Sequence, residues 1–201
     1  MPGLREQKKD QTRRELSDAA LRLVLERGLE NVTREDIAGA AGVSARTFTN
    51  YFADKYDAMA YRQRERLRRS IDAFRGRPAD EPIWTSITES ALAPIEDDLS
   101  ATVALPDRSE LAQIRKLLMS DQIRNALTRD LFDEWQVAIA ERSGTDPERD
   151  LYPRLVAAVI GAAGDAAMEL YAESDPPVAF PVLLRAALDQ VAAGLPVPGQ
   201  R

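Results

Sequence analysis

The chain has 201 residues, 44% of them hydrophobic and 30% charged, which is enough apolar material for a well-buried core. It contains no cysteine and no histidine, so disulfides, thiol chemistry and the commonest metal ligands are excluded, and we expect neither a metal nor a cofactor. No segment approaches the roughly 20 apolar residues of a membrane helix, and residues 1–18 lack the apolar core of a signal peptide. We therefore expect a cytoplasmic protein with no membrane partner.

The net charge of −6 is divided unevenly along the chain. Residues 1–70 hold 15 Lys and Arg against 11 Asp and Glu, whereas residues 71–201 hold 12 against 22. A basic N-terminal part attracts a polyanion such as DNA, and an acidic remainder keeps the other surfaces away from it. By itself this asymmetry is modest evidence, because random scatter of charge gives similar differences.

The first predicted helix spans about residues 7–27. Leu16, Ala20, Leu23 and Val24 recur at helical spacing, and Gly28 follows as a natural C-cap. The beginning of this segment is basic, and it either follows the DNA backbone or forms a solvated terminus. The basic residues of this N-terminal arm are Arg5, Lys8, Lys9, Arg13 and Arg14.

Residues 33–55 predict two short capped helices joined by a glycine turn. Thr33 and Ser44 stand at N-cap positions, and Gly42 ends the first of the two helices. Five apolar residues are expected to point inward and hold the two helices against a third; these are Ile37, Ala41, Val43, Phe48 and Phe52.

The opposite face of the second helix is polar. Arg46, Thr49 and Asn50 share it at positions i, i+3 and i+4. This arrangement is typical of a helix-turn-helix that places its second helix in the major groove of DNA. An ordinary helical hairpin with a solvated polar face gives a similar pattern.

Residues 12–58 match a known family pattern in about a dozen positions. These are Gly28, Thr33, Ile37-Ala38, Ala41-Gly42-Val43-Ser44, Thr47-Phe48, Tyr51-Phe52 and Lys55. The chain thereby resembles the TetR-type bacterial transcriptional repressors. Many of these proteins carry an aromatic residue, often Tyr, where this chain has Thr49, so operator preference does not transfer. Beyond about residue 75 the resemblance is only architectural.

The predicted DNA-binding residues are Thr33, Ser44, Ala45, Arg46, Thr47, Thr49, Asn50, Tyr51 and Lys55. Among them Arg46, Thr49 and Asn50 are expected to read base edges. The others that are assigned a role lie at helix ends or flanks and are expected to hold phosphates; these are Thr33, Thr47, Tyr51 and Lys55.

The remainder of the chain also predicts helices. A fourth helix over about residues 55–74 carries a dense run of arginines and ends before Gly76, Pro78 and Pro82. Further helices are predicted at about 83–100, 107–119, 121–142, 147–173 and 179–194, without strand-like alternation. We expect an all-α fold of about nine helices. Its DNA-binding domain covers 1–54, and an effector-binding and dimerisation domain covers 55–201, with the fourth helix as the connector.

The last two predicted helices hold more apolar residues than a one-sided surface helix needs. A two-fold interface of four helices explains this excess, although intramolecular core must account for part of it. The resemblance implies a homodimer at the same place. The predicted interface residues are Val156, Val159, Ile160, Ala163, Ala167, Leu183, Ala187, Leu188 and Val191.

The resemblance also implies a cavity for a small effector among the fifth to eighth helices. Pro94 interrupts an otherwise helical run and would kink the fifth helix beside such a cavity. The predicted lining is apolar, which favours a largely apolar effector, and each lining residue could equally be core. These residues are Trp84, Ile87, Ala91, Ile95, Leu118, Met119, Trp135, Ile139 and Met168.

The sequence therefore predicts a ligand-responsive repressor that binds a pseudo-palindromic operator as a dimer and is released by its effector. A constitutive regulator without effector is the first alternative. A helical enzyme is another, but the acids Glu96, Asp97 and Asp98 crowd one stretch without an evident basic partner, which is typical of a solvated helix end. We expect no enzyme. An architectural DNA-coating protein would be basic throughout.

Overall fold

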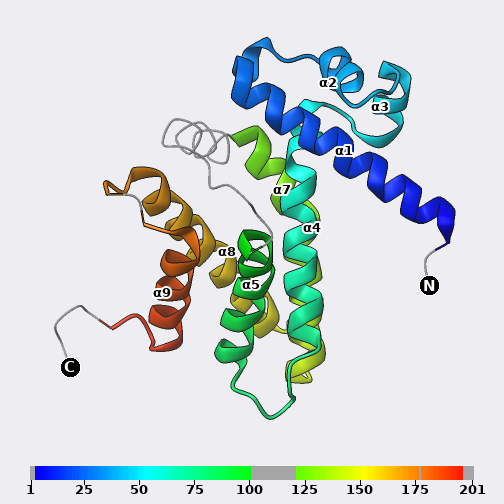
Figure 1. Cartoon of the computed structure of the whole chain (residues 1–201). Coiled ribbons are helices and arrows are strands. Elements are labelled where there is room, and N and C mark those ends of the chain that lie inside the picture. The colour runs from blue at the N-terminus through cyan, green and yellow to red at the C-terminus, as the bar shows by residue number, and fades with distance from the viewer. Residues whose placement is uncertain (1–2, 101–120, 177, 197–201) are drawn as a thin grey trace. The chain divides into compact units, whose positions relative to one another are not determined.

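The computed structural model describes residues 3–100, 121–176 and 178–196, and these residues form helices and no strand (Figure 1). The elements are α1 (Leu4–Arg27), the 3-10 helix η1 (Leu29–Asn31), α2 (Arg34–Ala40), α3 (Ala45–Tyr51), α4 (Lys55–Arg75), α5 (Ile83–Ser100), α7 (Asp121–Ser143), α8 (Leu151–Glu173) and α9 (Phe180–Ala192). The all-α prediction is confirmed. The helix predicted over 107–119 lies outside the described residues.

The described residues fall into two compact units. The N-terminal unit contains α1 to α3, α4 as far as Glu65, and α7 as far as Leu127. The C-terminal unit contains α4 from Arg66, all of α5, α7 from Thr128, and both α8 and α9. Helix α4 is continuous, and its two halves belong to different units.

The N-terminal unit folds as its capping residues and apolar spacing predict. Gly28 ends α1 with a φ of 80°, a left-handed conformation that glycine adopts without strain. The apolar stripe of α1 is buried against inward residues of α2 and α3. Buried members of this core are Leu16, Ala20, Leu23, Val24, Ile37, Phe48 and Phe52, and Ala41 and Val43 pack against them.

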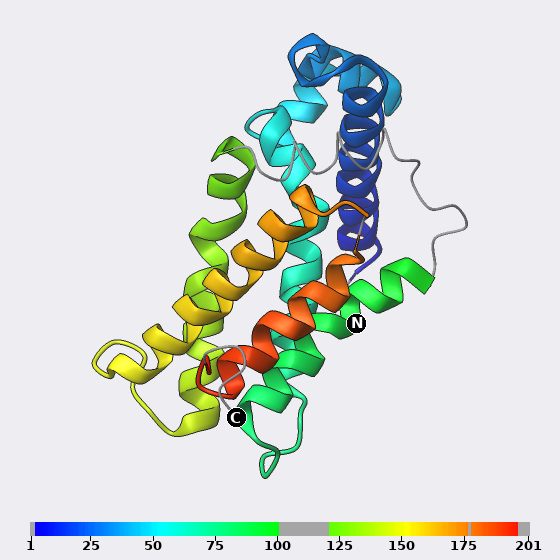
Figure 2. The same ribbon diagram turned by 90° about the vertical axis from the view of Figure 1, so that its left-hand side faces the viewer.

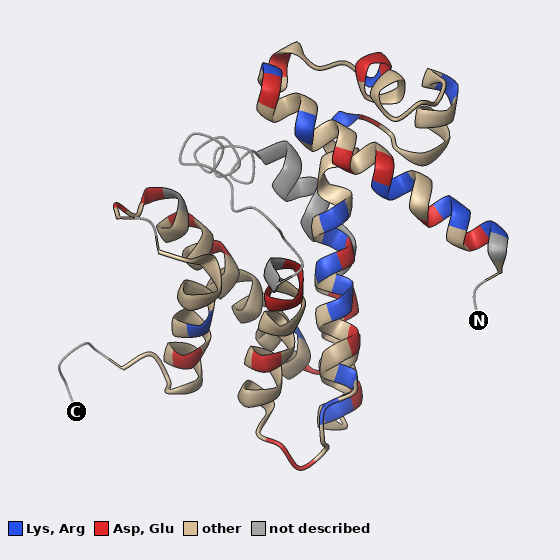
Figure 3. Cartoon of the chain, viewed as in Figure 1, with Lys and Arg blue, Asp and Glu red and all other residues tan. Residues whose placement is uncertain are grey.

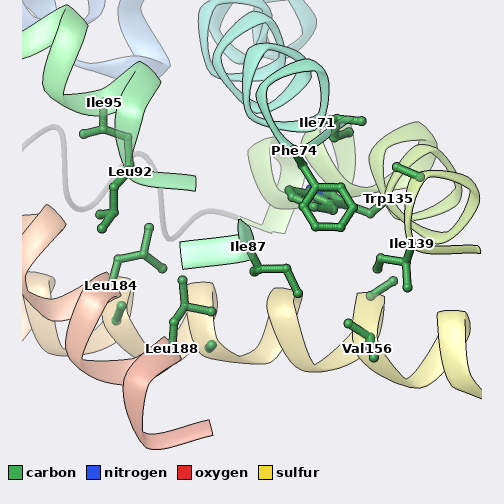
Figure 4. Packing of buried hydrophobic residues seen from close by; sticks show 14 residues of the cluster. Ile71, Phe74, Ile87, Leu92, Ile95, Trp135, Ile139, Val156, Leu184 and Leu188 are labelled. Carbon is green, nitrogen blue, oxygen red and sulfur yellow. The ribbon is translucent and has the colours of Figure 1, made fainter. Parts of the chain in front are cut away.

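The C-terminal unit has its own apolar core, formed between α4, α5, α7, α8 and α9. Phe74 of α4 lies against Trp135 of α7 with ring centroids 5.3 Å apart. Figure 4 shows Leu184 and Leu188 of α9 pointing toward α5, which contributes Ile87 and Leu92.

The turn between α4 and α5 is held by one arginine. Arg142 of α7 donates hydrogen bonds to the carbonyl oxygens of Arg77, Pro78 and Glu81, and its guanidinium lies over the ring of Phe74 at 5.3 Å from the centroid. Beside it, hydrogen bonds from Arg77 and from the hydroxyl of Ser86 lower the pKa of the Glu81 carboxyl to about 2.

The start of α8 differs from the prediction. The helix predicted over about 147–173 starts later, and α8 begins at Leu151. The Asp146 carboxylate instead accepts hydrogen bonds from the backbone N–H groups of Glu148 and Arg149, which closes a separate turn before the helix. Pro153 occupies the first turn of α8, where proline costs no hydrogen bond.

Helices α8 and α9 lie side by side and run in opposite directions within the C-terminal unit (Figure 2). No helix among the described residues is long and apolar enough to cross a membrane.

Candidate functional site

The start of α2 is fixed by a reciprocal cap. The Thr33 side chain accepts a hydrogen bond from the backbone N–H of Asp36, and the Asp36 carboxylate accepts one from the backbone N–H of Thr33 at 2.9 Å. Hydrogen bonds from the Thr33 hydroxyl and from its backbone lower the pKa of the Asp36 carboxyl. The N-cap prediction for Thr33 is confirmed.

The start of α3 is fixed in a similar way. The Ser44 hydroxyl oxygen accepts a hydrogen bond from the backbone N–H of Thr47 at 3.0 Å, and the two hydroxyls lie 2.8 Å apart. Gly42 has a φ of 69°, which allows the chain to turn so that Val43 N–H donates to the Ala38 carbonyl at 2.9 Å. These bonds set the direction of α3 relative to α2.

The polar face of α3 is exposed as predicted. Arg46, Thr49 and Asn50 all lie in solvent, whereas Phe48 on the other side of the helix is 0% exposed. The Thr49 hydroxyl donates to the carbonyl of Ala45 at 3.0 Å, so its proton is used within the helix and its oxygen faces outward as an acceptor. A short helix with one buried and one polar face is the geometry that groove reading requires.

Tyr51 and Lys55 follow this face at the end of α3 and the start of α4. Tyr51 is half-buried, and the guanidinium of Arg13 lies over its ring at 5.8 Å from the centroid. Lys55 donates hydrogen bonds to the carbonyl oxygens of Leu29 at 2.7 Å and Val32 at 3.1 Å. We call these two hydrogen bonds the Lys55 clamp. The sequence did not reveal it, because the partners of Lys55 lie far away along the chain.

The basic residues gather on α4 and on the N-terminal half of α1 (Figure 3). In the N-terminal unit, Arg14 donates two hydrogen bonds to the Glu65 carboxylate, and Arg62 pairs with Asp18 at 3.1 Å. These pairs join α1 to the first half of α4.

The arginines in the second half of α4 pair with acidic residues of the C-terminal unit. Arg66 and Arg69 donate to the Asp98 carboxylate of α5 at 2.8 and 2.7 Å, and Arg75 pairs with Glu141 of α7 at 3.0 Å. Burial alone would raise the pKa of Asp98, but the hydrogen bonds from Arg69 and Arg66 lower it overall. The acidic stretch around Asp98 therefore does have basic partners, contrary to the sequence analysis.

Two segments of the chain match the sequence profiles of known protein families. The sequence profile described as bacterial regulatory proteins, tetR family, matches residues 16–58, and the profile of the MftR C-terminal domain matches residues 121–196. The chain belongs to the TetR family. It is a DNA-binding transcriptional regulator, and this family is not one of enzymes.

Individual TetR-family relatives align along nearly the whole chain. The transcriptional regulator TcmR of Streptomyces glaucescens is 29% identical, over 94% of this chain and 87% of its own length. A TetR-family regulator from Syntrophomonas wolfei has a similar fold, with a TM-score of 0.62 at 17% identity, covering 94% of this chain and 99% of that one. The repressor FadR of Thermus thermophilus was solved with lauroyl-CoA. Its fold matches with a TM-score of 0.57 at 20% identity, covering 94% of this chain and 97% of that one.

The residues predicted to line an effector site converge on the core of the C-terminal unit. Ile87, Ile95, Trp135 and Ile139 are buried in it. Trp84 and Ala91 pack against that core, and Met168 is half-buried on α8, whereas Leu118 and Met119 lie outside the described residues.

The predicted dimer residues lie mostly in or against the core of a single chain. The structure places eight of the nine in or against the core of the C-terminal unit: Val156, Ile160, Ala163, Ala167, Leu183, Ala187, Leu188 and Val191. Val159 is half-buried. Of the nine, Val156, Ala163, Ala167 and Leu188 are buried within the chain. The other five are half-buried, and their place in an interface stays a prediction.

A different apolar face of α8 is exposed. Its members recur at helical spacing and form what we call the α8 stripe: Leu151, Leu155, Ala158, Ala162, Ala166 and Leu170. The three leucines are 73%, 54% and 53% exposed, and Val182 at the start of α9 is 59% exposed. Because α8 is apolar on nearly all sides, its sequence periodicity does not distinguish the inner from the outer face.

Proposed function

We propose that the protein binds a pseudo-palindromic operator as a homodimer, represses transcription there, and is released by a small, largely apolar effector. The observation that carries the DNA-binding part is the two-sided α3. Its exposed face holds Arg46, Thr49 and Asn50, and its buried Phe48 anchors it to the unit.

This geometry supports the proposed roles of individual residues on the DNA. Arg46 and Asn50 have side chains that suit bidentate contacts to guanine and adenine edges, and the Thr49 oxygen is a further acceptor. Thr33 and Thr47 lie in the first turns of α2 and α3, where backbone N–H groups favour phosphate. Ser44 and Ala45 stand at the start of α3, and Tyr51 and Lys55 flank its end. Contacts to phosphates position the protein on the DNA without reading its sequence.

The α8 stripe supports the homodimer. Exposed contiguous apolar residues on a soluble protein mark an interaction surface. A two-fold axis beside α8 would pair the stripe with itself and bring α8 and α9 of both protomers into a four-helix arrangement. The small residues Ala158, Ala162 and Ala166 would let the two copies of α8 approach closely.

The effector part of the proposal has support from α5 and from one relative. Pro94 lies inside α5, among apolar residues of the C-terminal core. The Thermus thermophilus FadR was solved with lauroyl-CoA, which carries a long apolar chain. An apolar effector that entered this core would contact α5 directly.

The arginines of α4 offer a path from that core to the DNA-binding unit. Asp98 near the end of α5 holds Arg66 and Arg69, and the same continuous helix carries Glu65 and Arg62, which pair with α1. A displacement of α5 beyond Pro94 would therefore pull on α4. Coupling of about 1 to 3 kcal/mol, or 5- to 150-fold in operator affinity, is typical of such linkage.

Nuclease protection of the DNA upstream of the protein's own gene tests the proposal. The expected footprint is a pseudo-palindrome, which a member of a panel of small apolar metabolites removes. A footprint that no compound alters would favour the constitutive regulator. Protection without sequence preference would overturn the assignment of α3 as a base-reading helix.

A further inference from the structure

The hydroxyl of Ser90 on α5 has no hydrogen-bond partner within the described part of the chain, although the residue is only 1% exposed. Other buried serines of the same unit are satisfied. The Ser70 hydroxyl donates to the carbonyl of Arg66 at 3.2 Å, and the Ser86 hydroxyl donates to the Glu81 carboxylate at 2.5 Å. A buried hydroxyl without a partner is uncommon in proteins and costs free energy.

The backbone carbonyl of Ser90 also lacks its usual hydrogen-bond donor. In an α-helix its carbonyl oxygen would accept from the N–H of residue 94, but that residue is proline and has no N–H. Ser90 thus presents a hydroxyl without a partner and a carbonyl without its helical donor. Together they offer one donor and two acceptors.

The neighbours of Ser90 on α5 are mostly apolar, apart from Ser86, one turn before it, whose hydroxyl is already bonded to Glu81. Ile87 and Pro94 lie one turn before and one turn after it and are buried, and Ala91 packs against the core. Glu89, which precedes Ser90 in the chain, is already paired with Arg185 of α9 at 2.8 Å. A neutral ligand group is therefore the one that fits this position.

We propose that Ser90 is the polar anchor for the effector, and that the effector is a neutral, mostly apolar molecule carrying a hydroxyl group. The ligand hydroxyl donates to the Ser90 carbonyl and accepts from the Ser90 hydroxyl, so both groups gain a partner at once. This inference rests on the proposed effector function and adds the chemistry of the ligand.

A pair of probes that differ by one hydroxyl tests the anchor. Dissociation constants of 2-naphthol and naphthalene are measured by equilibrium dialysis for the full-length protein and for Ser90→Ala. The naphthalene-to-naphthol ratio of dissociation constants should be about 5- to 10-fold higher in the wild type than in Ser90→Ala, which is the effect of one hydrogen bond. Ser70→Ala, a buried serine with a partner, is the matched control and should keep the wild-type ratio.

Folding is monitored by thermal melting without probe. Ser90→Ala should melt no lower than the wild type, because the substitution removes an unsatisfied group, whereas Ser70→Ala should melt lower. Equal probe ratios in wild type and Ser90→Ala, no binding of either probe, or a lower melting temperature for Ser90→Ala would each overturn the anchor.

The anchor and the proposed function fail in distinguishable ways. If the probe ratio behaves as expected while no compound alters operator affinity, the anchor stands and effector release fails. If a compound releases the operator while the ratio is the same in both proteins, effector release stands and the anchor at Ser90 fails.

Discussion

The ammonium group of Lys55 donates a hydrogen bond of 2.7 Å to the carbonyl oxygen of Leu29. A second bond, to the carbonyl of Val32, ties the first residue of α4 to the segment that precedes α2. An ammonium carries three N–H donors, so one is left for a DNA phosphate in the proposed complex. Lys55 thus supports the helix-turn-helix from within, and in the proposed complex its third donor would bind a phosphate.

Lys55→Met should lower both stability and DNA affinity. Loss of the two hydrogen bonds should cost about 1 to 3 kcal/mol in the free energy of unfolding, because hydrogen bonds to charged groups are among the stronger ones. Operator variants should all weaken alike, and the salt dependence should flatten by about one unit of slope. Urea denaturation and titrations at several salt concentrations measure these effects. An unchanged unfolding curve would contradict the clamp.

Arg46→Ala should change specificity and leave the fold alone. Arg46 is exposed on α3, so the melting temperature should stay within the error of the wild type. Affinity for the operator should fall by about 1 to 3 kcal/mol, with relaxed preference at particular base pairs. Lys9→Met in the exposed beginning of α1 is the control for a general loss of positive charge. If Arg46→Ala weakened all operator variants equally, base reading would be assigned to the wrong residue.

The helix-turn-helix could be predicted from sequence because its determinants are local. Thr33 and Ser44 cap the helices that directly follow them, and Gly28 and Gly42 adopt the left-handed conformation at the helix ends that they mark. The Lys55 clamp could not be predicted. Its partners lie 26 and 23 residues earlier, and a backbone carbonyl leaves no trace in the sequence.

Leu155→Glu should convert the proposed dimer into a monomer. Leu155 is 54% exposed in the N-terminal part of the α8 stripe, so a glutamate there costs the isolated chain little but places two like charges in a two-fold interface. Sedimentation velocity at micromolar concentration measures the change. Val137→Glu, at an exposed apolar position of α7, is the matched control and should stay dimeric.

Leu188→Ala tests a buried position of α9 for comparison with the exposed α8 stripe. Leu188 is 0% exposed, so its truncation should lower the free energy of unfolding by about 2 to 5 kcal/mol. The folded fraction should keep its association state. A monomeric wild type, or a dimer that persists in Leu155→Glu, would show that the α8 stripe is not the dimer interface.

The face of α8 could not be chosen from sequence because neighbouring residues on both sides of the helix are apolar. Leu155 is exposed and Val156 is buried, yet both suit an interface or a core. The two faces become distinct only through packing against α9 and the rest of the C-terminal core. The unpartnered hydroxyl of Ser90 likewise depends on which atoms surround it.

The Glu81 ion pair predicts a pH dependence of stability. The pKa of its carboxyl is lowered from 4.5 to about 2 in the folded protein, so its stabilising effect is complete above about pH 4.5 and is lost as the pH falls toward 2. Glu81→Gln should therefore be less stable than the wild type at pH 6, and the difference should vanish near pH 2. Thermal melts across this range measure it, with Glu148→Gln in the turn before α8 as the control. A difference that does not change with pH would contradict the ion pair.

The central claim is that a two-fold dimer reads its operator through α3, and a substitution scan of the operator tests it most directly. Each base pair of the protected site is replaced in turn, and the affinity is measured for the wild type and for Arg46→Ala. We predict two mirror-related groups of sensitive base pairs with centres about 10 base pairs apart or a multiple of that. In Arg46→Ala, the equivalent base pair of each group should no longer affect affinity. A flat profile, or one sensitive group without a mirror-related partner, would contradict the claim.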